Sequence, residues 1–346
     1  MFYSSTVTAP RVRWEYTAPS LTALAYPYLL QGYSGAMKAG HGWLAWLPLG
    51  FAFGVSLVGF LASVSLGRHA HPDAGVVIAK RFAWLAVAAP PLYTAAGVLL
   101  TMIGDPLADT TIWLVFWIGA PLLGIVAARM GRRVTPATVA PRLRMAHGVS
   151  ALAIVLLFLA MHLFSHLAAL ASVAQEHHWM NVFRKVYRAD LIEPLVVLLF
   201  LFQVLSGLQM LRILSARASD VFQTLQSVSG AYLVFFILAH MNSVFFYARR
   251  YSHISTDWDF ATGAPTGLLH DAWNIRLVPH YTLGVFLVLT HLLLGARVVL
   301  LAHGRPSGRV NAWTKAGIAA AALLALAILS GMCGVHLLDS TATLAG

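Results

Sequence analysis

Residues 145–170 read MAHGVSALAIVLLFLAMHLFSHLAAL, and residues 225–246 read LQSVSGAYLVFFILAHMNSVFF. Each stretch is long and apolar enough to cross the hydrocarbon core of a bilayer as a helix. The histidines His162 and His240 lie about six residues, or about 9 Å, from the C-terminal ends of these helices. Ionisable residues at such depth are costly and mark functional positions. Two imidazoles at matched depth are what a six-coordinate haem iron needs, one on each face.

The composition of the whole chain predicts a polytopic membrane protein. The chain has 346 residues, of which 59% are hydrophobic and 10% are charged, and its mean hydropathy is +0.75. Soluble domains carry about 25% charged residues. The apolar runs are continuous and not alternating, which favours helices over a barrel. We therefore expect an all-α fold, a polytopic membrane helical bundle of about eight transmembrane helices.

Eight apolar segments are predicted as spans: 43–66, 80–103, 111–129, 146–170, 191–214, 222–247, 278–301 and 314–336. A further segment, 19–36, contains Pro27 and several hydroxyl groups, and we expect it to be interfacial or re-entrant. The composition divides the chain into two lobes. Residues 1–140 form a three-helix membrane lobe of unknown role, and residues 141–346 form a five-helix lobe with nearly all of the membrane-embedded histidines.

Basic residues orient the predicted bundle. Of 23 Lys and Arg residues, 14 fall in or near the even-numbered connections, where only two of the 12 acidic residues lie. The positive-inside rule places these connections in the cytoplasm, and an Ala-rich composition favours a bacterial inner membrane. No basic helix or aromatic platform lies outside the spans, so a nucleic-acid partner is not expected. The 14 basic residues are Arg68, Lys80, Arg81, Arg129, Arg132, Arg133, Arg142, Arg144, Arg212, Arg217, Arg297, Arg305, Arg309 and Lys315.

Two levels of candidate ligands follow from this orientation. His162 and His240 lie on helices that run in the same direction, so both fall in the outer leaflet, and they are the predicted metal ligands. Gln203 and His291 lie on helices that run the other way, about 20 Å from the outer surface. The bundle thus offers one level near the outer face and a second one deeper. His147, near the inner end of its span, is expected to be a boundary residue.

Small residues near these levels predict room for a flat cofactor. Ser229 and Gly230 lie early in one span, and Gly207 follows Gln203 by one turn. Glycine lets a porphyrin approach a helix backbone where a side chain would collide with it. Close helix–helix packing through small residues is the alternative, and it remains open. His166, one turn beyond His162, is expected at the edge of the haem or at the membrane interface.

Other cofactor chemistry finds little support in the sequence. The single cysteine, Cys333, excludes an intramolecular disulfide, an iron–sulfur cluster held by cysteines and covalent haem attachment. The sequence contains no HExxH, P-loop or GxSxG motif. With no flavin motif either, the chain by itself is at most the electron-transfer subunit of an oxidoreductase.

Residues 141–346 resemble the cytochrome b membrane anchors of succinate dehydrogenases and fumarate reductases, and related mitochondrial membrane proteins of the Mcp1 type. The resemblance rests on SALAIVLLFLAMHL, EPLVVLLFLFQVLSGL, SGAYLVFFILAHM and HYTLGVFLVLTHLLLGAR. In two-haem members, four successive helices each give one axial histidine, the first pairing with the third and the second with the fourth. The resemblance implies that His162 and His240 form one pair. Gln203 stands where a histidine would face His291, so the resemblance implies a complete ligand pair for one haem only.

The sequence therefore predicts an integral membrane b-type cytochrome that passes electrons between a quinone pool and a partner redox protein. Its cofactor is haem b, one and at most two, with quinone as a second small molecule and a soluble redox subunit as partner. Arginines near the outer face, namely Arg184, Arg188, Arg249 and Arg250, are candidates to hold the propionates. Two alternatives stay open. One is a haem-free scaffold or assembly protein of the same fold. The other is a transporter whose helices break at Pro90, Pro91 and Pro121.

Overall fold

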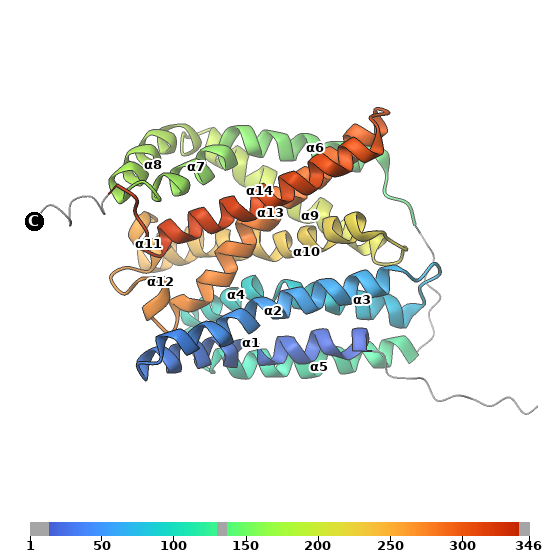
Figure 1. The fold of residues 1–346 in the computed structure, drawn as a ribbon, viewed down its shortest axis with the longest axis horizontal. Coiled ribbons are helices and arrows are strands. Elements are labelled where there is room, and N and C mark those ends of the chain that lie inside the picture. The colour runs from blue at the N-terminus through green and yellow to red at the C-terminus, as the bar shows by residue number, and fades with distance from the viewer. Residues whose placement is uncertain (1–13, 130–136, 339–346) are drawn as a thin grey trace, which may run out of the picture.

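The protein is described by a computed structural model that covers residues 14–129 and 137–338. Over these residues the structure contains helices and no β-strand, which confirms the predicted all-α class (Figure 1). Seven helices are long and apolar enough to cross a membrane, or eight if one bent pair counts as a span. The chain is therefore an integral membrane protein built as a polytopic helical bundle. Two of the basic residues used to orient it, Arg132 and Arg133, lie outside the described residues.

The helices follow the predicted spans closely. The N-terminal lobe contains α1 (Trp14–Lys38), α2 (Gly42–Gly67), α3 (Ala74–Val87), α4 (Ala89–Met102) and α5 (Asp109–Arg129). The next span is formed by α6 (Pro141–Ile154), the π-helical η1 (Val155–Leu159) and α7 (Ala160–Ala168), followed by α8 (Val173–Tyr187) and α9 (Ile192–Leu214). Then come α10 (Val221–Met241), the π-helical η2 (Asn242–Ser252), α11 (Trp258–Thr262), α12 (Gly267–His270), the short η3 (Asn274–Arg276), α13 (Leu277–Ala302) and α14 (Ser307–Met332).

The second predicted span, 80–103, is not one continuous helix. It is broken at Ala88, where α3 and α4 meet at a bend of 68°. Pro90 and Pro91 occupy the first turn of α4, where proline starts a helix well but cannot continue one from before it. The carbonyl of Val87 at the break accepts a hydrogen bond of 2.8 Å from Ser56 Oγ on α2. The break is therefore a satisfied junction in the packed bundle.

The interfacial or re-entrant segment predicted at 19–36 is also corrected. Residues 14–38 form one continuous helix of 25 residues, and Figure 1 shows α1 lying alongside α2. Its aromatic side chains Tyr26 and Tyr33 are buried in the bundle. Trp113 of α5 donates a hydrogen bond of 2.7 Å to the carbonyl of Ala23. Packing on α2 and α5 thus holds a helix that its own hydropathy does not identify as a span.

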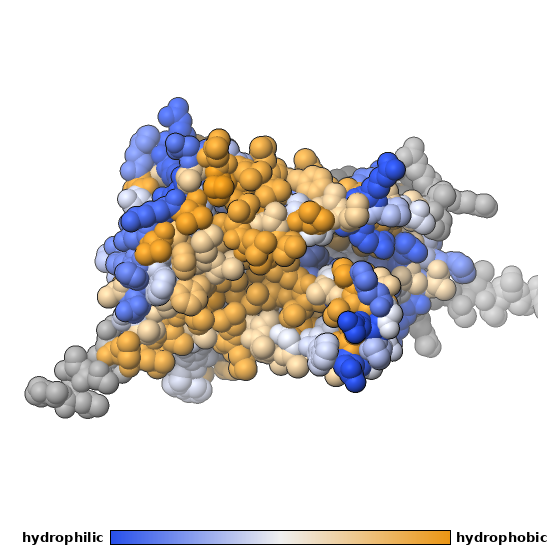
Figure 2. Space-filling view, turned by 90° about the horizontal axis from the view of Figure 1, so that it is seen from above, coloured by the Kyte–Doolittle hydropathy of each residue, from blue (hydrophilic) through white to orange (hydrophobic). Residues whose placement is uncertain are grey.

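The surface has the polarity that a bilayer requires. Figure 2 shows hydrophobic residues over the middle of the molecule and hydrophilic residues gathered at both ends. Large apolar side chains are exposed around this middle zone, among them Phe51, Leu156 and Leu198, each more than 60% exposed. Exposed apolar surface on this scale is stable in lipid and not in water.

The two predicted lobes share their hydrophobic core. Figure 1 shows α1–α5 on one side of the bundle, with α10 between them and α6–α9. One buried cluster joins Trp84 and Val87 of the first lobe to Val228 and Tyr232 of α10. The histidine-bearing helix α10 is thereby fixed from both sides.

Candidate functional site

Histidines gather at the end of the bundle that carries α8, α11 and α12, here called the α8 end (Figure 1). His162 and His166 lie one turn apart on α7, and His240 is the penultimate residue of α10. His280 lies in the first turn of α13 and is 2% exposed. The structure thus brings three helices together around these rings.

The rings of His162 and His240 lie close together. Their centres are 6.1 Å apart, and their planes are inclined by 66°. Metal–imidazole bonds are about 2 Å long and the ring centre lies roughly 1 Å behind the bonding nitrogen, so two rings on one metal need centres roughly 6 Å apart. Rotation of either ring about the ligand–iron axis leaves ligation intact. The spacing and the inclination therefore fit two axial ligands of one haem.

Both of these histidines adjoin π-helical segments. His162 lies three residues after η1, and His240 lies two residues before η2. A π-helical turn inserts an extra residue and re-aims the side chains that follow, and such turns are frequent at functional sites. Helical spacing in the sequence gives no sign of η1, so the exact direction of the His162 ring was not predictable.

Phenylalanines hold the two rings in place. The ring of Phe158 stacks on His162 with centres 4.8 Å apart, and the ring of Phe236 stacks on His240 at 5.6 Å. Phe236 also lies 4.6 Å from the ring of His280. Gly284 leaves room for the ring of Phe236, because a Cβ atom at position 284 would collide with that ring. The ring orientations are thus set by apolar packing on the same helices and on α13.

His166 lies beside His162, as expected, but its surroundings were not foreseen. Its ring centre is 4.7 Å from that of His162 and 6.0 Å from that of Trp258 in α11. Its Nδ1 atom lies 3.9 Å from Oε1 of Glu176, a carboxylate of α8 that is 0% exposed. His177 Nε2 lies 4.0 Å from the other oxygen of Glu176.

Glu176 is the acidic group that sequence reasoning missed. Burial raises the pKa of this carboxyl to about 7, against the lowering effect of the nearby Arg184. Glu176, Met180 and Tyr187 are the buried residues of α8, which lies outside the spans. Their spacing of four and seven residues marks one helix face. That amphipathic pattern was the available signal.

Arginines form a basic group at the α8 end. Arg184 donates to the carbonyl of Thr256, and Arg188 Nη2 donates to Thr256 Oγ1 at 2.6 Å. Arg249 forms an ion pair of 2.8 Å with Glu193. Burial, and after it the charges of Arg184 and Arg249, lower the pKa of Arg188. Three of the four arginines proposed for propionates therefore lie close together, whereas Arg250 is exposed.

At the second, deeper level, the ring near His291 is that of His147 and not the predicted partner Gln203. His291 of α13 faces His147 of α6, with ring centres 6.3 Å apart and planes inclined by 75°. Gln203, the predicted partner, is engaged by α6: its Nε2 donates to the carbonyl of His147 at 2.8 Å and to Ser150 Oγ at 2.6 Å. His147 lies 15 residues before His162, about four helical turns, so both fall near one face of the same span. That spacing was the sequence signal for His147.

The predicted small residues lie at this second level. A Cβ atom at Gly207 would be 3.8 Å from His147 Cε1, and one at Gly230 would be 3.1 Å from His291 Cε1. Ser229 Oγ lies 3.0 Å from His291 Nδ1. These three residues therefore surround the His147 and His291 rings, and not the His162 and His240 rings.

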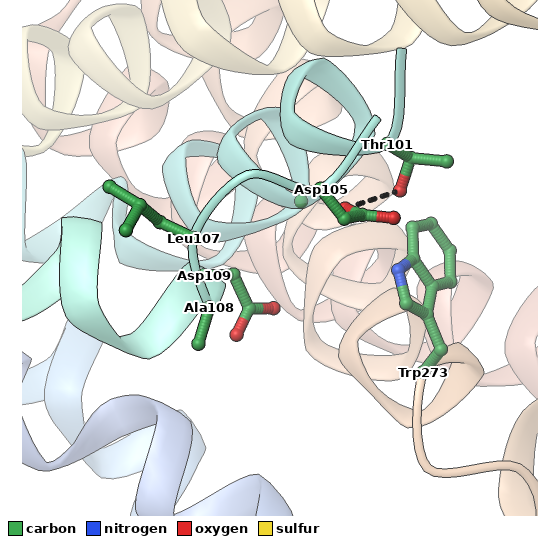
Figure 3. A pocket seen from close by; sticks show the side chains of 7 residues that line it. Thr101, Asp105, Leu107, Ala108, Asp109 and Trp273 are labelled. Carbon is green, nitrogen blue, oxygen red and sulfur yellow. Dashed lines mark hydrogen bonds between the residues drawn. The ribbon is translucent and has the colours of Figure 1, made fainter. Parts of the chain in front are cut away.

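Two cavities open at the α8 end. The smaller, of about 250 Å³, is lined by Thr101, Asp105, Asp109 and Trp273 among others, and Figure 3 shows these side chains around it. The larger, of about 600 Å³, has polar and aromatic lining residues that include Ser243, Tyr247 and Tyr281. Its volume is within the usual range for small-molecule sites, roughly 300–1,000 Å³. Ser243 follows His240 by three residues, so one wall of this cavity lies about one helical turn from His240.

In the part of the chain that the structure describes, no group of three or more His, Cys, Asp or Glu side chains converges as a metal site. A haem needs only two protein ligands, because its porphyrin supplies the other four donors. A pair of histidines is therefore enough to hold a haem. Comparison with family models, with curated proteins and with solved structures finds no match to this chain.

Proposed function

We propose that the chain is a membrane-embedded b-type cytochrome in which His162 and His240 hold one haem b. The observation that carries the proposal is the separation of 6.1 Å between their ring centres, on two different helices at one depth. Bound haem would supply one-electron transfer. The chain's own part is to hold two imidazoles in register, to exclude water and to balance charge.

Named residues would divide these tasks. Phe158 and Phe236 stack on the two imidazoles and restrict their rotation. Arg184, Arg188 and Arg249 gather positive charge at the α8 end, where charge-assisted hydrogen bonds to propionates would be strong. Apolar surroundings would raise the reduction potential by disfavouring the additional positive charge of ferric iron.

The α8 end is also where electrons would enter or leave. The cavity of about 600 Å³ lies beside Ser243 and combines aromatic rings with hydroxyl and carboxylate groups, which suits a quinone headgroup. A soluble partner would complete the electron path. The basic connections at the opposite end favour a bacterial inner membrane with the α8 end outside. A short-chain quinol should reduce the haem in purified protein, and failure to do so would remove quinone from the proposal.

Reduced-minus-oxidised absorption spectra of the purified protein test the proposal. We expect a sharp α band of b type in the wild type, and a reduced haem content in both His162→Ala and His240→Ala. His270→Ala, at an exposed position in α12, is the matched control and should keep the full content. A folded wild type that is colourless after production with ample haem would contradict the cytochrome and favour a haem-free scaffold or a transporter.

A further inference from the structure

Hydrogen bonds fix the protonation of His291. Its Nδ1 atom lies 3.2 Å from the carbonyl oxygen of Gln226, and a carbonyl only accepts. Nδ1 must therefore carry the proton in the neutral ring. Ser229 Oγ, 3.0 Å from the same nitrogen, donates its own hydrogen to Gln226 O at 3.0 Å. The lone pair of His291 is left on Nε2, which is the form that binds a metal.

The same argument applies to His147. Its Nδ1 atom lies 2.7 Å from Ser206 Oγ. The one hydrogen of that hydroxyl is donated to the carbonyl of Phe202, at 2.6 Å. Ser206 Oγ can then only accept from His147, so Nδ1 carries the proton and Nε2 carries the lone pair. Both rings of the pair are thus held by second hydrogen bonds of the kind that orient histidine ligands in metal sites.

We propose that His147 and His291 are the axial ligands of a second haem. The inference rests on the proposed function for the identity of the cofactor. The ring centres of this pair are 6.3 Å apart, against 6.1 Å at the first pair, and the ring planes are inclined by 75° against 66°. The rings of His147 and His291 are oriented by hydrogen bonds at Nδ1. The rings of His162 and His240 are oriented instead by stacking on Phe158 and Phe236.

This assignment differs from what the resemblance implied. The resemblance pairs the second helix of the five-helix lobe with the fourth, which would set Gln203 against His291. Here the first helix provides both His147 and His162, and the fourth provides His291. Gln203 positions the backbone of α6 through its bonds to His147 O and Ser150 Oγ. The substitution of histidine by glutamine in α9 therefore does not remove the second site.

The depths of the two pairs suit two haems. The 15 residues from His147 to His162 correspond to about 22 Å along the span, so the two sites would lie at different depths of a hydrocarbon core of about 30 Å. Gly207 and Gly230 keep side chains away from the His147 and His291 rings. Two one-electron centres at these depths would form a path across the bilayer.

The haem-to-protein ratio of the full-length purified protein, from pyridine haemochrome spectra and amino-acid analysis, tests the inference. We expect two haems per chain in the wild type. His147→Ala and His291→Ala should each lower the ratio to one, and so should their combination. His162→Ala should also lower it to one, whereas the exposed His270→Ala should keep it at two. The haem that remains in His147→Ala reports that the variant has folded.

Rescue by imidazole separates a lost ligand from a damaged helix. Imidazole added during production of His147→Gly should restore the ratio to two, because the free base can occupy the position of the missing ring. One haem per chain, lost in His162→Ala and unchanged in His147→Ala, would overturn the second site and leave the proposed function standing. No haem at all would overturn both. Elemental analysis that finds a metal without porphyrin at His147 and His291 would also overturn the inference.

Discussion

At the scale of the residue, depth along a helix was predictable and ring direction was not. The sequence places His162 and His240 at one depth, and the structure brings their rings to 6.1 Å. His147 was assigned to a membrane boundary because it lies near the start of its span. Its ring nevertheless faces His291, because Ser206 and Gln203 hold it from α9. Such contacts between helices have no counterpart in the spacing of residues along one chain.

Glu176 carries a prediction about pH. The usual pKa of 4.5 is raised to about 7 by burial. The folded state therefore holds this proton between pH 4.5 and 7, where the unfolded state has lost it, and the contribution of Glu176 to stability falls as pH rises through that window. Glu176→Gln should abolish the fall and should make the protein more stable than wild type at pH 8, by roughly 1–3 kcal/mol. Thermal unfolding in detergent across pH 4–9 measures this.

The exposed Asp190→Asn is the control for that comparison and should keep the wild-type profile. His166, His177, Arg184 and Asp257 are the charged or titratable groups around Glu176, and the first three favour its ionised form when protonated. A stability difference between Glu176→Gln and the wild type that stays constant between pH 4.5 and 7 would contradict the raised pKa of this carboxyl.

At the scale of the element, span positions followed from hydropathy, whereas breaks within spans did not. Seven predicted spans match single helices or helices with a π-helical segment, and the bent α3–α4 pair replaces 80–103. Pro90 and Pro91 predict a break in the helix, but the free carbonyl at the break is satisfied by Ser56 from another helix. The sequence did not predict that α1 lies alongside α2, because α1 is not apolar enough by itself and is held in the bundle by α2 and α5. Packing partners, which the sequence does not name, decided both cases.

The contact between α4 and η3 gives a prediction at this scale. Arg276 Nη2 forms an ion pair of 2.9 Å with Asp109, and its guanidinium lies 4.6 Å from the ring centre of Tyr93. A Cβ atom at Gly97 would lie 2.3 Å from Arg276 Nη1. Gly97→Ala should therefore displace the guanidinium and lower the stability of the protein by about 1–3 kcal/mol. The thermal midpoint in detergent is the measurement.

Gly119→Ala is the matched control, because a Cβ atom at that position of α5 meets no atom within 4 Å. It should leave the midpoint unchanged or raise it slightly, since alanine favours a helix over glycine. Equal midpoints for the two variants would mean that Arg276 moves aside freely and that its ion pair contributes little to holding η3 against α5.

At the scale of the whole molecule, the two histidine pairs define a direction. His162 and His240 lie toward the α8 end, with the arginine group and both cavities. His147 and His291 lie toward the opposite end, where most of the basic connections are expected. Electrons that enter at the α8 end would reach the other face only through the second pair. The biological role of the protein therefore depends on which end faces the cytoplasm.

Labelling of single cysteines determines that orientation. Cys333 is the only cysteine, so Cys333→Ser gives a background without reactive thiols. Ala218→Cys, in the exposed connection between α9 and α10, and His270→Cys, in the exposed part of α12, then report on opposite ends. A membrane-impermeant maleimide should label His270→Cys in intact bacterial cells and Ala218→Cys only after permeabilisation, because basic connections stay in the cytoplasm. The reverse pattern would place the His162–His240 pair, and the cavity beside it, on the cytoplasmic face, and any soluble partner would then have to be cytoplasmic.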